Sequence, residues 1–168
     1  MSAPIAIANR QAACPLSQTA LRRLAAWLMA RAEARDTTLA GCALSVVLVD
    51  DRGITPLNRT FIGHEGPTDV ISFRYDRIPG APQGTAEVVV NAERAVQEAR
   101  RRGIPVHREL ALYLAHGCLH LTGADDATPD QRAAMQRIQN RWLQQAGRTG
   151  LLHGICPASA GQRRAARV

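Results

Sequence analysis

The sequence predicts an α+β fold, a single small domain in which helices cover a mixed sheet of about four strands. Its 168 residues, 46% of them hydrophobic, are enough to build one sizeable core. Four short apolar runs have the length and the β-branched content of strands, at residues 5–9, 43–49, 69–75 and 86–90. Longer segments with helical periodicity separate and follow these runs, which is the alternation that predicts mixed α and β structure.

The second apolar run has the composition of a buried central strand. Ala43 to Val49 is almost wholly apolar and ends at Asp50, Asp51, Arg52 and Gly53, residues that suit a tight turn. The runs at 69–75 and 86–90 follow each other closely along the chain, so we expect them to pair as neighbours. Residues 5–9 alternate like a short strand.

Capping signals divide the rest of the chain into helices. A first helix begins near Ser17 and carries Leu21, Leu24 and Leu28 at spacings of three and four. Asn91 can cap a second helix that runs to Arg102, and a third helix should run from about His107 to Gly123. A fourth helix begins at a capping box formed by Thr128, Pro129 and Gln131. Its apolar core stripe consists of Met135, Ile138 and Trp142.

The charge of the chain is positive and unevenly distributed. All 21 basic residues are Arg, and with 14 acidic residues they give a net charge of +7. Residues 147–168 contain four Arg and no acid, and they lack sustained periodicity. We therefore expect a domain over residues 1–146 and a basic, disordered tail over residues 147–168. The excess of Arg fits either polyanion binding or a bias in composition.

The sequence also predicts a cytoplasmic location without a membrane partner. No apolar run reaches the length of about 18 residues that a bilayer crossing needs, and residues 1–14 lack the basic start of a signal peptide. The four cysteines form no Cys-x-x-Cys pair, which favours a reducing compartment.

The run from His116 to Asp126 has the spacing of a metal site. On a helix, His116 and His120 project about 40° apart and about 6 Å along the axis, so both rings can face one ion. Gly123 allows a left-handed turn that brings Asp125 and Asp126 back towards the histidines. Two histidines and one carboxylate would leave a fourth position open, as in catalytic zinc sites.

The same spacing occurs in the metzincin zinc peptidases, with one decisive difference. Those enzymes carry a Glu directly after the first His as the general base, and this chain has Gly117 there. Peptidase activity therefore loses its main support.

Two blocks of the sequence resemble the YbeY family of endoribonucleases, which mature ribosomal RNA. The run from His116 resembles the family signature His-Gly-x-Leu-His-Leu-x-Gly-Tyr-Asp-His. Leu57, Asn58 and Phe61, with the run from Pro67 to Phe73, resemble the family block Leu-Asn-x-x-Tyr-Arg-x-x-Asp-x-Pro-Thr-Asp-Val-Leu-Ser-Phe. Glu87 to Val90, preceded by Gly84, is similar to the family's Gly-Asp-Ile strand, so the resemblance covers residues 5–146.

The resemblance implies a zinc-dependent endoribonuclease that cleaves single-stranded RNA, with one Zn²⁺ ion held by His116, His120 and Asp126. It further implies maturation of the 3′ end of 16S ribosomal RNA, ribosome quality control and the small ribosomal subunit as partner. Asp125 matches the family's Asp and is a candidate catalytic residue, either orienting a histidine or competing with Asp126 for the metal.

The chain departs from the family at functional positions. The family's third metal-binding His corresponds to Asp126, its Tyr to Ala124, its Arg to Ile62 and the Pro after Ser-Phe to Arg74. We hypothesise that Arg59, three residues before Ile62, partly replaces the missing guanidinium near the scissile phosphate. Arg74 is a candidate RNA contact. These departures keep an alternative open, a catalytically weakened, ribosome-associated RNA-binding protein, while a zinc peptidase remains a third reading.

Overall fold

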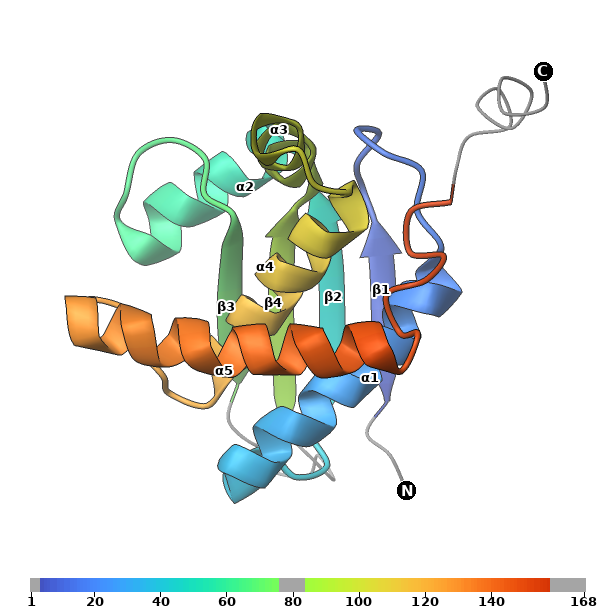
Figure 1. Cartoon of the computed structure of the whole chain (residues 1–168). Coiled ribbons are helices and arrows are strands. Elements are labelled where there is room, and N and C mark those ends of the chain that lie inside the picture. Colours follow the sequence, from blue (N-terminus) through green and yellow to red (C-terminus); the bar gives the residue numbers. More distant parts are fainter. Residues whose placement is uncertain (1–3, 76–83, 158–168) are drawn as a thin grey trace, which may run out of the picture.

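A four-stranded mixed sheet forms the centre of the computed structural model, which describes residues 4–75 and 84–157 (Figure 1). Its strand order is β1-β2-β4-β3, where the strands are β1 (Ile5–Asn9), β2 (Ala43–Val49), β4 (Thr85–Asn91) and β3 (Val70–Tyr75). β1 and β4 run parallel to β2, whereas β3 is antiparallel to β4. The predicted α+β class, the central position of residues 43–49 and the pairing of β3 with β4 are confirmed.

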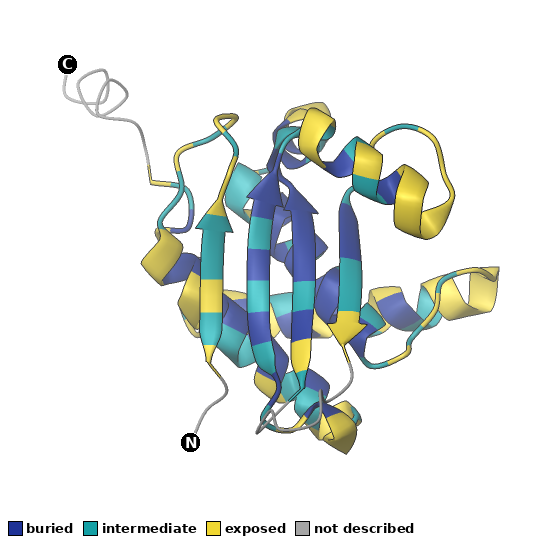
Figure 2. Ribbon diagram, turned by 180° about the vertical axis from the view of Figure 1, so that it is seen from behind, coloured by how far each residue is buried: buried dark blue, intermediate teal, exposed yellow. Residues whose placement is uncertain are grey.

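Most of the helices lie on one face of this sheet (Figures 1 and 2). α1 (Gln18–Arg35) and α4 (Val106–Leu121) pack on it and close the main core, and α5 (Pro129–Arg148) packs on α4. α3 (Ala92–Arg102) precedes α4 and packs beside it. On the opposite face, residues of α2 (Asp51–Leu57) and of the strands form a small second apolar cluster. The π-helical turn η2 (Asn58–Ile62) directly follows α2. The short 3-10 helix η1 (Thr37–Leu39) links α1 to β2.

Local capping fixes the helix starts that the sequence predicts. The Ser17 Oγ accepts a hydrogen bond from the Ala20 N–H, and the Asn91 Oδ1 accepts one from the Arg94 N–H. At the start of α5, Thr128 and Gln131 form both bonds of a capping box. These bonds satisfy N–H groups that have no partner within the helix.

The segment after α5 belongs to the packed domain, which corrects the predicted boundary at residue 146. α5 continues to Arg148, and the following turns bury Leu152 and Ile155 in the main core. The Ile155 carbonyl also accepts a hydrogen bond of 2.8 Å from the Ser17 N–H. The predicted disordered tail is thus wrong for residues 147–157, while residues 158–168 lie outside the described part of the chain.

This segment also brings together two cysteines that are far apart in the sequence. A hydrogen bond between the Cys14 and Cys156 thiols lowers the pKa of Cys14, and the same bond together with burial raises the pKa of Cys156. All four cysteines are free thiols. In residues 4–75 and 84–157, no helix combines the length and the hydropathy that a membrane crossing requires.

We expect Ile155→Ala to destabilise the domain by about 2–5 kcal/mol, because it leaves a cavity in a fully buried position. Urea unfolding followed by circular dichroism would measure the change. His153→Ala, at an exposed position of the same segment, should stay within about 0.5 kcal/mol of the parent. Equal unfolding free energies for the two variants would mean that the segment contributes no packing.

Candidate metal centre

The position of α4 depends on a close contact between Gly117 and the sheet. A Cβ atom placed on Gly117 would lie 2.5 Å from Val88 Cγ1 and 2.9 Å from Val70 Cγ2. The Ser72 hydroxyl donates a hydrogen bond of 2.8 Å to the Gly117 carbonyl. The position therefore has no room for the Glu of a zinc peptidase, and the peptidase alternative loses further support.

With Gly117 against the sheet, His116 and His120 lie on the part of α4 that solvent reaches. Their Nε2 atoms are 3.0 Å apart and the ring planes are nearly perpendicular, at 87°. The Nδ1 atoms face acceptors instead, the Ala124 carbonyl at 2.9 Å from His120 and the Gln139 Oε1 at 3.1 Å from His116. Both rings are thus oriented by a partner at Nδ1.

These partners decide where the ring protons lie. A carbonyl oxygen can only accept, so His120 in its neutral form carries its proton on Nδ1, and the Gln139 oxygen imposes the same tautomer on His116. Both Nε2 lone pairs then point at each other across 3.0 Å. A divalent metal ion bound by both lone pairs would remove the repulsion between them.

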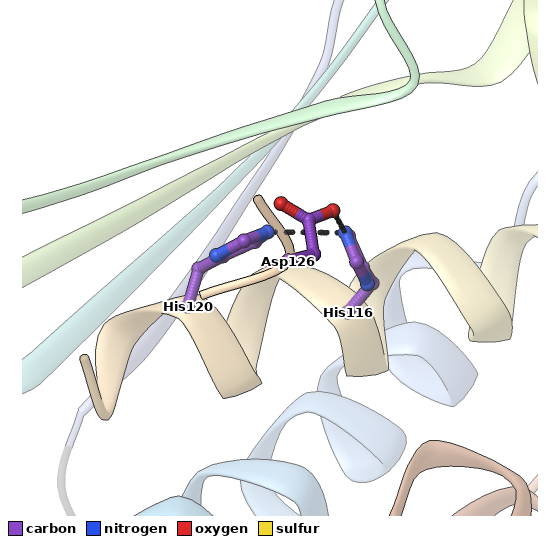
Figure 3. A group of neighbouring side chains, drawn as sticks. All are labelled: His116, His120 and Asp126. Carbon is purple, nitrogen blue, oxygen red and sulfur yellow. Dashed lines mark hydrogen bonds and ion pairs between the residues drawn. The ribbon is translucent and has the colours of Figure 1, made fainter. Parts of the chain in front are cut away.

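Asp126, from the loop that follows α4, completes the group (Figure 3). Gly123 adopts a left-handed conformation with φ of 79°, and the chain turns back so that Asp126 Oδ2 lies 3.5 Å from His116 Nε2. Arg132 in the first turn of α5 donates to the backbone carbonyls of Asp126 and Ala127. The left-handed turn that the sequence predicts at Gly123 is confirmed.

The three side chains could hold one metal ion, and the spacing of two ligand pairs is close to that of tetrahedral zinc. One ligand atom from each of His116, His120 and Asp126 lies within 4.8 Å of the other two. Ligands of tetrahedral zinc at about 2.1 Å are separated from one another by roughly 3.4 Å, close to the 3.0 and 3.5 Å found for two of the pairs. Two imidazoles and a carboxylate are also donors that zinc accepts.

Asp125 is not a member of this group. Its side chain is exposed, and its Oδ1 accepts a hydrogen bond of 2.8 Å from the Asp126 N–H. This bond helps to hold the backbone from which Asp126 projects. The catalytic role predicted for Asp125 stays a prediction.

Arg59 and Ile62 both lie on η2. Arg59 is exposed and forms no ion pair or hydrogen bond within the described residues. Ile62 is 49% exposed and its neighbour Phe61 is 62% exposed. No contact in the described chain joins Arg59 to the metal group, so its catalytic role stays a prediction as well.

Arg74 has a structural environment that the sequence did not indicate. Its guanidinium pairs with the Asp36 carboxylate at 2.8 Å, donates to the Thr38 hydroxyl and reaches the Leu121 carbonyl at the end of α4. Hydrogen bonds from Thr38 first, and then from Arg74, lower the pKa of Asp36. Arg74 thus ties β3 to the end of the metal-site helix, and its contact with RNA stays a prediction.

Gln139 is the site residue that the sequence analysis missed. It is only 8% exposed and lies on the core stripe of α5, between Met135 and Trp142. A polar side chain on an otherwise apolar helical stripe was the available signal, because a buried amide needs a hydrogen-bond partner. That partner is His116.

The fold and the side chains together define a class of protein, a small α+β domain with a candidate metal site of two histidines and one carboxylate. The model of the family described as Endoribonuclease YbeY matches residues 6–147. The chain belongs to the YbeY family.

Individual relatives agree with this assignment. The chain is 40% identical over 116 residues to the Endoribonuclease YbeY of Rhodopirellula baltica, covering 66% of this chain and 59% of that protein. It is 35% identical over 146 residues to that of Thermobifida fusca, covering 83% and 91% of the two chains. The matched region thus spans little more than half the length of the first relative and most of the second.

A solved structure agrees with the fold. The solution structure of a protein from Thermotoga maritima superposes with a TM-score of 0.54 at 22% identity, covering 97% of this chain and 93% of the other. At this level of identity, the likeness concerns the fold alone.

We expect Gln139→Leu to weaken zinc binding by about 10- to 100-fold, because the His116 ring loses the acceptor that fixes its orientation and tautomer. Competition titration against a chromophoric chelator would measure the affinity. Gln136→Leu, at an exposed position of the same helix, is the matched control and should bind zinc like the parent. Equal affinity in both variants would show that Gln139 does not orient the ligand.

Proposed function

We propose that this chain is a zinc-dependent endoribonuclease that cleaves single-stranded RNA. The observation that carries the proposal is the pair of Nε2 atoms 3.0 Å apart, each on a ring held at Nδ1, with the Asp126 carboxylate beside them. Membership of the family described as Endoribonuclease YbeY supports RNA as the substrate. The net charge of +7 favours a polyanion.

The proposed ligands are His116, His120 and Asp126, which leave one corner of a tetrahedron for water or a phosphate oxygen. Bound zinc supplies Lewis acidity, which activates water and polarises a phosphoryl oxygen. Asp126 stands where the family has His, and its negative charge lowers the net charge of the site. Water at this site should therefore be less acidic than with three histidines.

The family likeness supports a finer proposal about the substrate. We infer that the chain acts on the 3′ end of 16S ribosomal RNA, in the cytoplasm, with the small ribosomal subunit as partner and a part in ribosome quality control. Its four free thiols are compatible with a reducing compartment.

An alternative function is favoured by one observation. Ile62, 49% exposed, occupies the position of the family's Arg and cannot stabilise negative charge on a phosphate. The chain would then bind RNA at the ribosome without efficient cleavage.

Cleavage of a labelled single-stranded RNA by the zinc-loaded protein tests the proposal. We expect cleavage that falls by more than about 100-fold in His120→Ala, because the metal loses a ligand. Metal analysis of both proteins should show one zinc per parent chain, lost in the variant.

Two results would contradict this expectation. Cleavage at the same rate by parent and His120→Ala would indicate a contaminating nuclease. Full zinc content with RNA binding and no cleavage by the parent would favour the RNA-binding alternative.

Arg59→Ala should lower the rate of RNA cleavage about 10-fold or more while zinc content stays complete, if Arg59 provides positive charge at the scissile phosphate. Single-turnover cleavage and metal analysis measure the two quantities. Arg52→Ala, an exposed Arg on the neighbouring helix α2, is the control with the same loss of charge. Equal rates in the two variants would exclude the role of Arg59.

A further inference from the structure

The solvent-accessible stripe of α4 continues well beyond the metal group. Most of the helix is buried, and from Arg108 to its end only Arg108, Leu112, His116 and His120 are not buried. Their spacing of four residues places them in one row along the helix. At about 1.5 Å per residue, Arg108 lies roughly 12 Å along the axis from His116.

A cavity of about 640 Å³ opens along the first half of this row, between the start of α4 and the end of α5. We call it the α4–α5 pocket. Its apolar lining comes from Ile104, Leu112, Leu143 and Leu152. Gly147 contributes no side chain, and a Cβ atom there would lie 3.8 Å from Leu152 Cδ1. The volume is in the range of pockets that hold small organic ligands.

The rim of the α4–α5 pocket is positively charged. Arg102, Arg108 and Arg148 lie around it together with one acid, Glu109. Glu109 is 2% exposed, and its carboxylate pairs with Arg102 at 3.0 Å, so these two charges neutralise each other. Arg108 and Arg148 form no ion pair within the described residues. An apolar lining together with two guanidinium groups that form no ion pair within the described residues suits a ligand with a flat, weakly polar body and an anionic group.

We propose that the α4–α5 pocket binds a nucleotide of the single-stranded RNA substrate that neighbours the scissile phosphate. The base contacts Leu112 and Leu143, and the phosphates pair with Arg108 and Arg148. The Asn140 and Gln144 amides, also in the lining, can bond to base edges. This inference rests on the proposed function, because the row on α4 connects the pocket to His116.

The first test changes the RNA and leaves the protein intact. The zinc-loaded chain is titrated with a short single-stranded RNA whose 2′-O-methyl and phosphorothioate groups resist cleavage. Removal of one base at a time should lower affinity about 10-fold at one position and little elsewhere, because one base is held in the pocket. A uniform response along the RNA would overturn the base contact.

The second test changes the charge of the rim. Arg108→Ala with Arg148→Ala should lower affinity about 10-fold at low salt and reduce the slope of log K against log salt by about 1.4, since each phosphate contact in a single strand contributes about 0.7. Arg137→Ala with Arg141→Ala, on exposed positions of α5 outside the lining, removes the same charge. Equal affinities and slopes for the two double variants would overturn the proposal.

The outcomes separate this proposal from the proposed function. If RNA binding depends on Arg108 and Arg148 but the parent never cleaves RNA, the pocket stands and the endoribonuclease assignment fails. If His120-dependent cleavage is observed but the affinity for RNA does not depend on Arg108 and Arg148, only the pocket proposal fails. Displacement of the RNA by oligoglutamate at equal charge concentration would assign the pocket to an acidic peptide and overturn it as well.

Discussion

The contact between Gly117 and the sheet is the constraint on which the site depends. A residue with any side chain would push α4 away from Val88 and Val70, and the hydrogen bond from Ser72 would be lost. Once the Gly117 face is against the sheet, helix geometry leaves one row of α4 free. That row carries His116 and His120. Gly117, a residue without a side chain, therefore determines the direction in which the two imidazoles point.

α5 provides the second constraint, because it contacts both His116 and the loop that carries Asp126. Gln139 orients His116 from the middle of the helix, and Arg132 fixes the backbone next to Asp126 from its first turn. The capping box at Thr128 sets where that first turn begins. The loop of residues 122–128 is thus tied at both ends, so the chain itself positions Asp126 next to the two histidines.

Local signals in the sequence were sufficient for the elements and for the grouping of His116, His120 and Asp126. The spacing of His116 and His120 and the left-handed turn at Gly123 are properties of neighbouring residues, and they predict the group correctly. The contacts that were missed join distant residues. Arg74 meets Asp36, and Ile155 enters the core beside α1, although no periodic pattern surrounds either residue. Tertiary packing decides such contacts, and a single sequence carries little trace of it.

The departures from the family change the charge near the reacting phosphate, and distance decides what can compensate for them. Asp126 in place of a neutral His and Ile62 in place of Arg would each lower the net charge near the reacting phosphate by one unit. Arg108 and Arg148 restore two such units at the α4–α5 pocket. At roughly 12 Å in water, however, a unit charge contributes only about 0.3 kcal/mol, and physiological salt screens it beyond about 8 Å. These arginines can hold RNA, but stabilising charge that develops during cleavage requires a cation within about 4 Å of the phosphate, where the interaction is about three times stronger. Under the proposed function, substrate binding and transition-state stabilisation would therefore rest on different residues of this chain, and the exposed Arg59 on η2, three residues before Ile62, is the candidate for the second task.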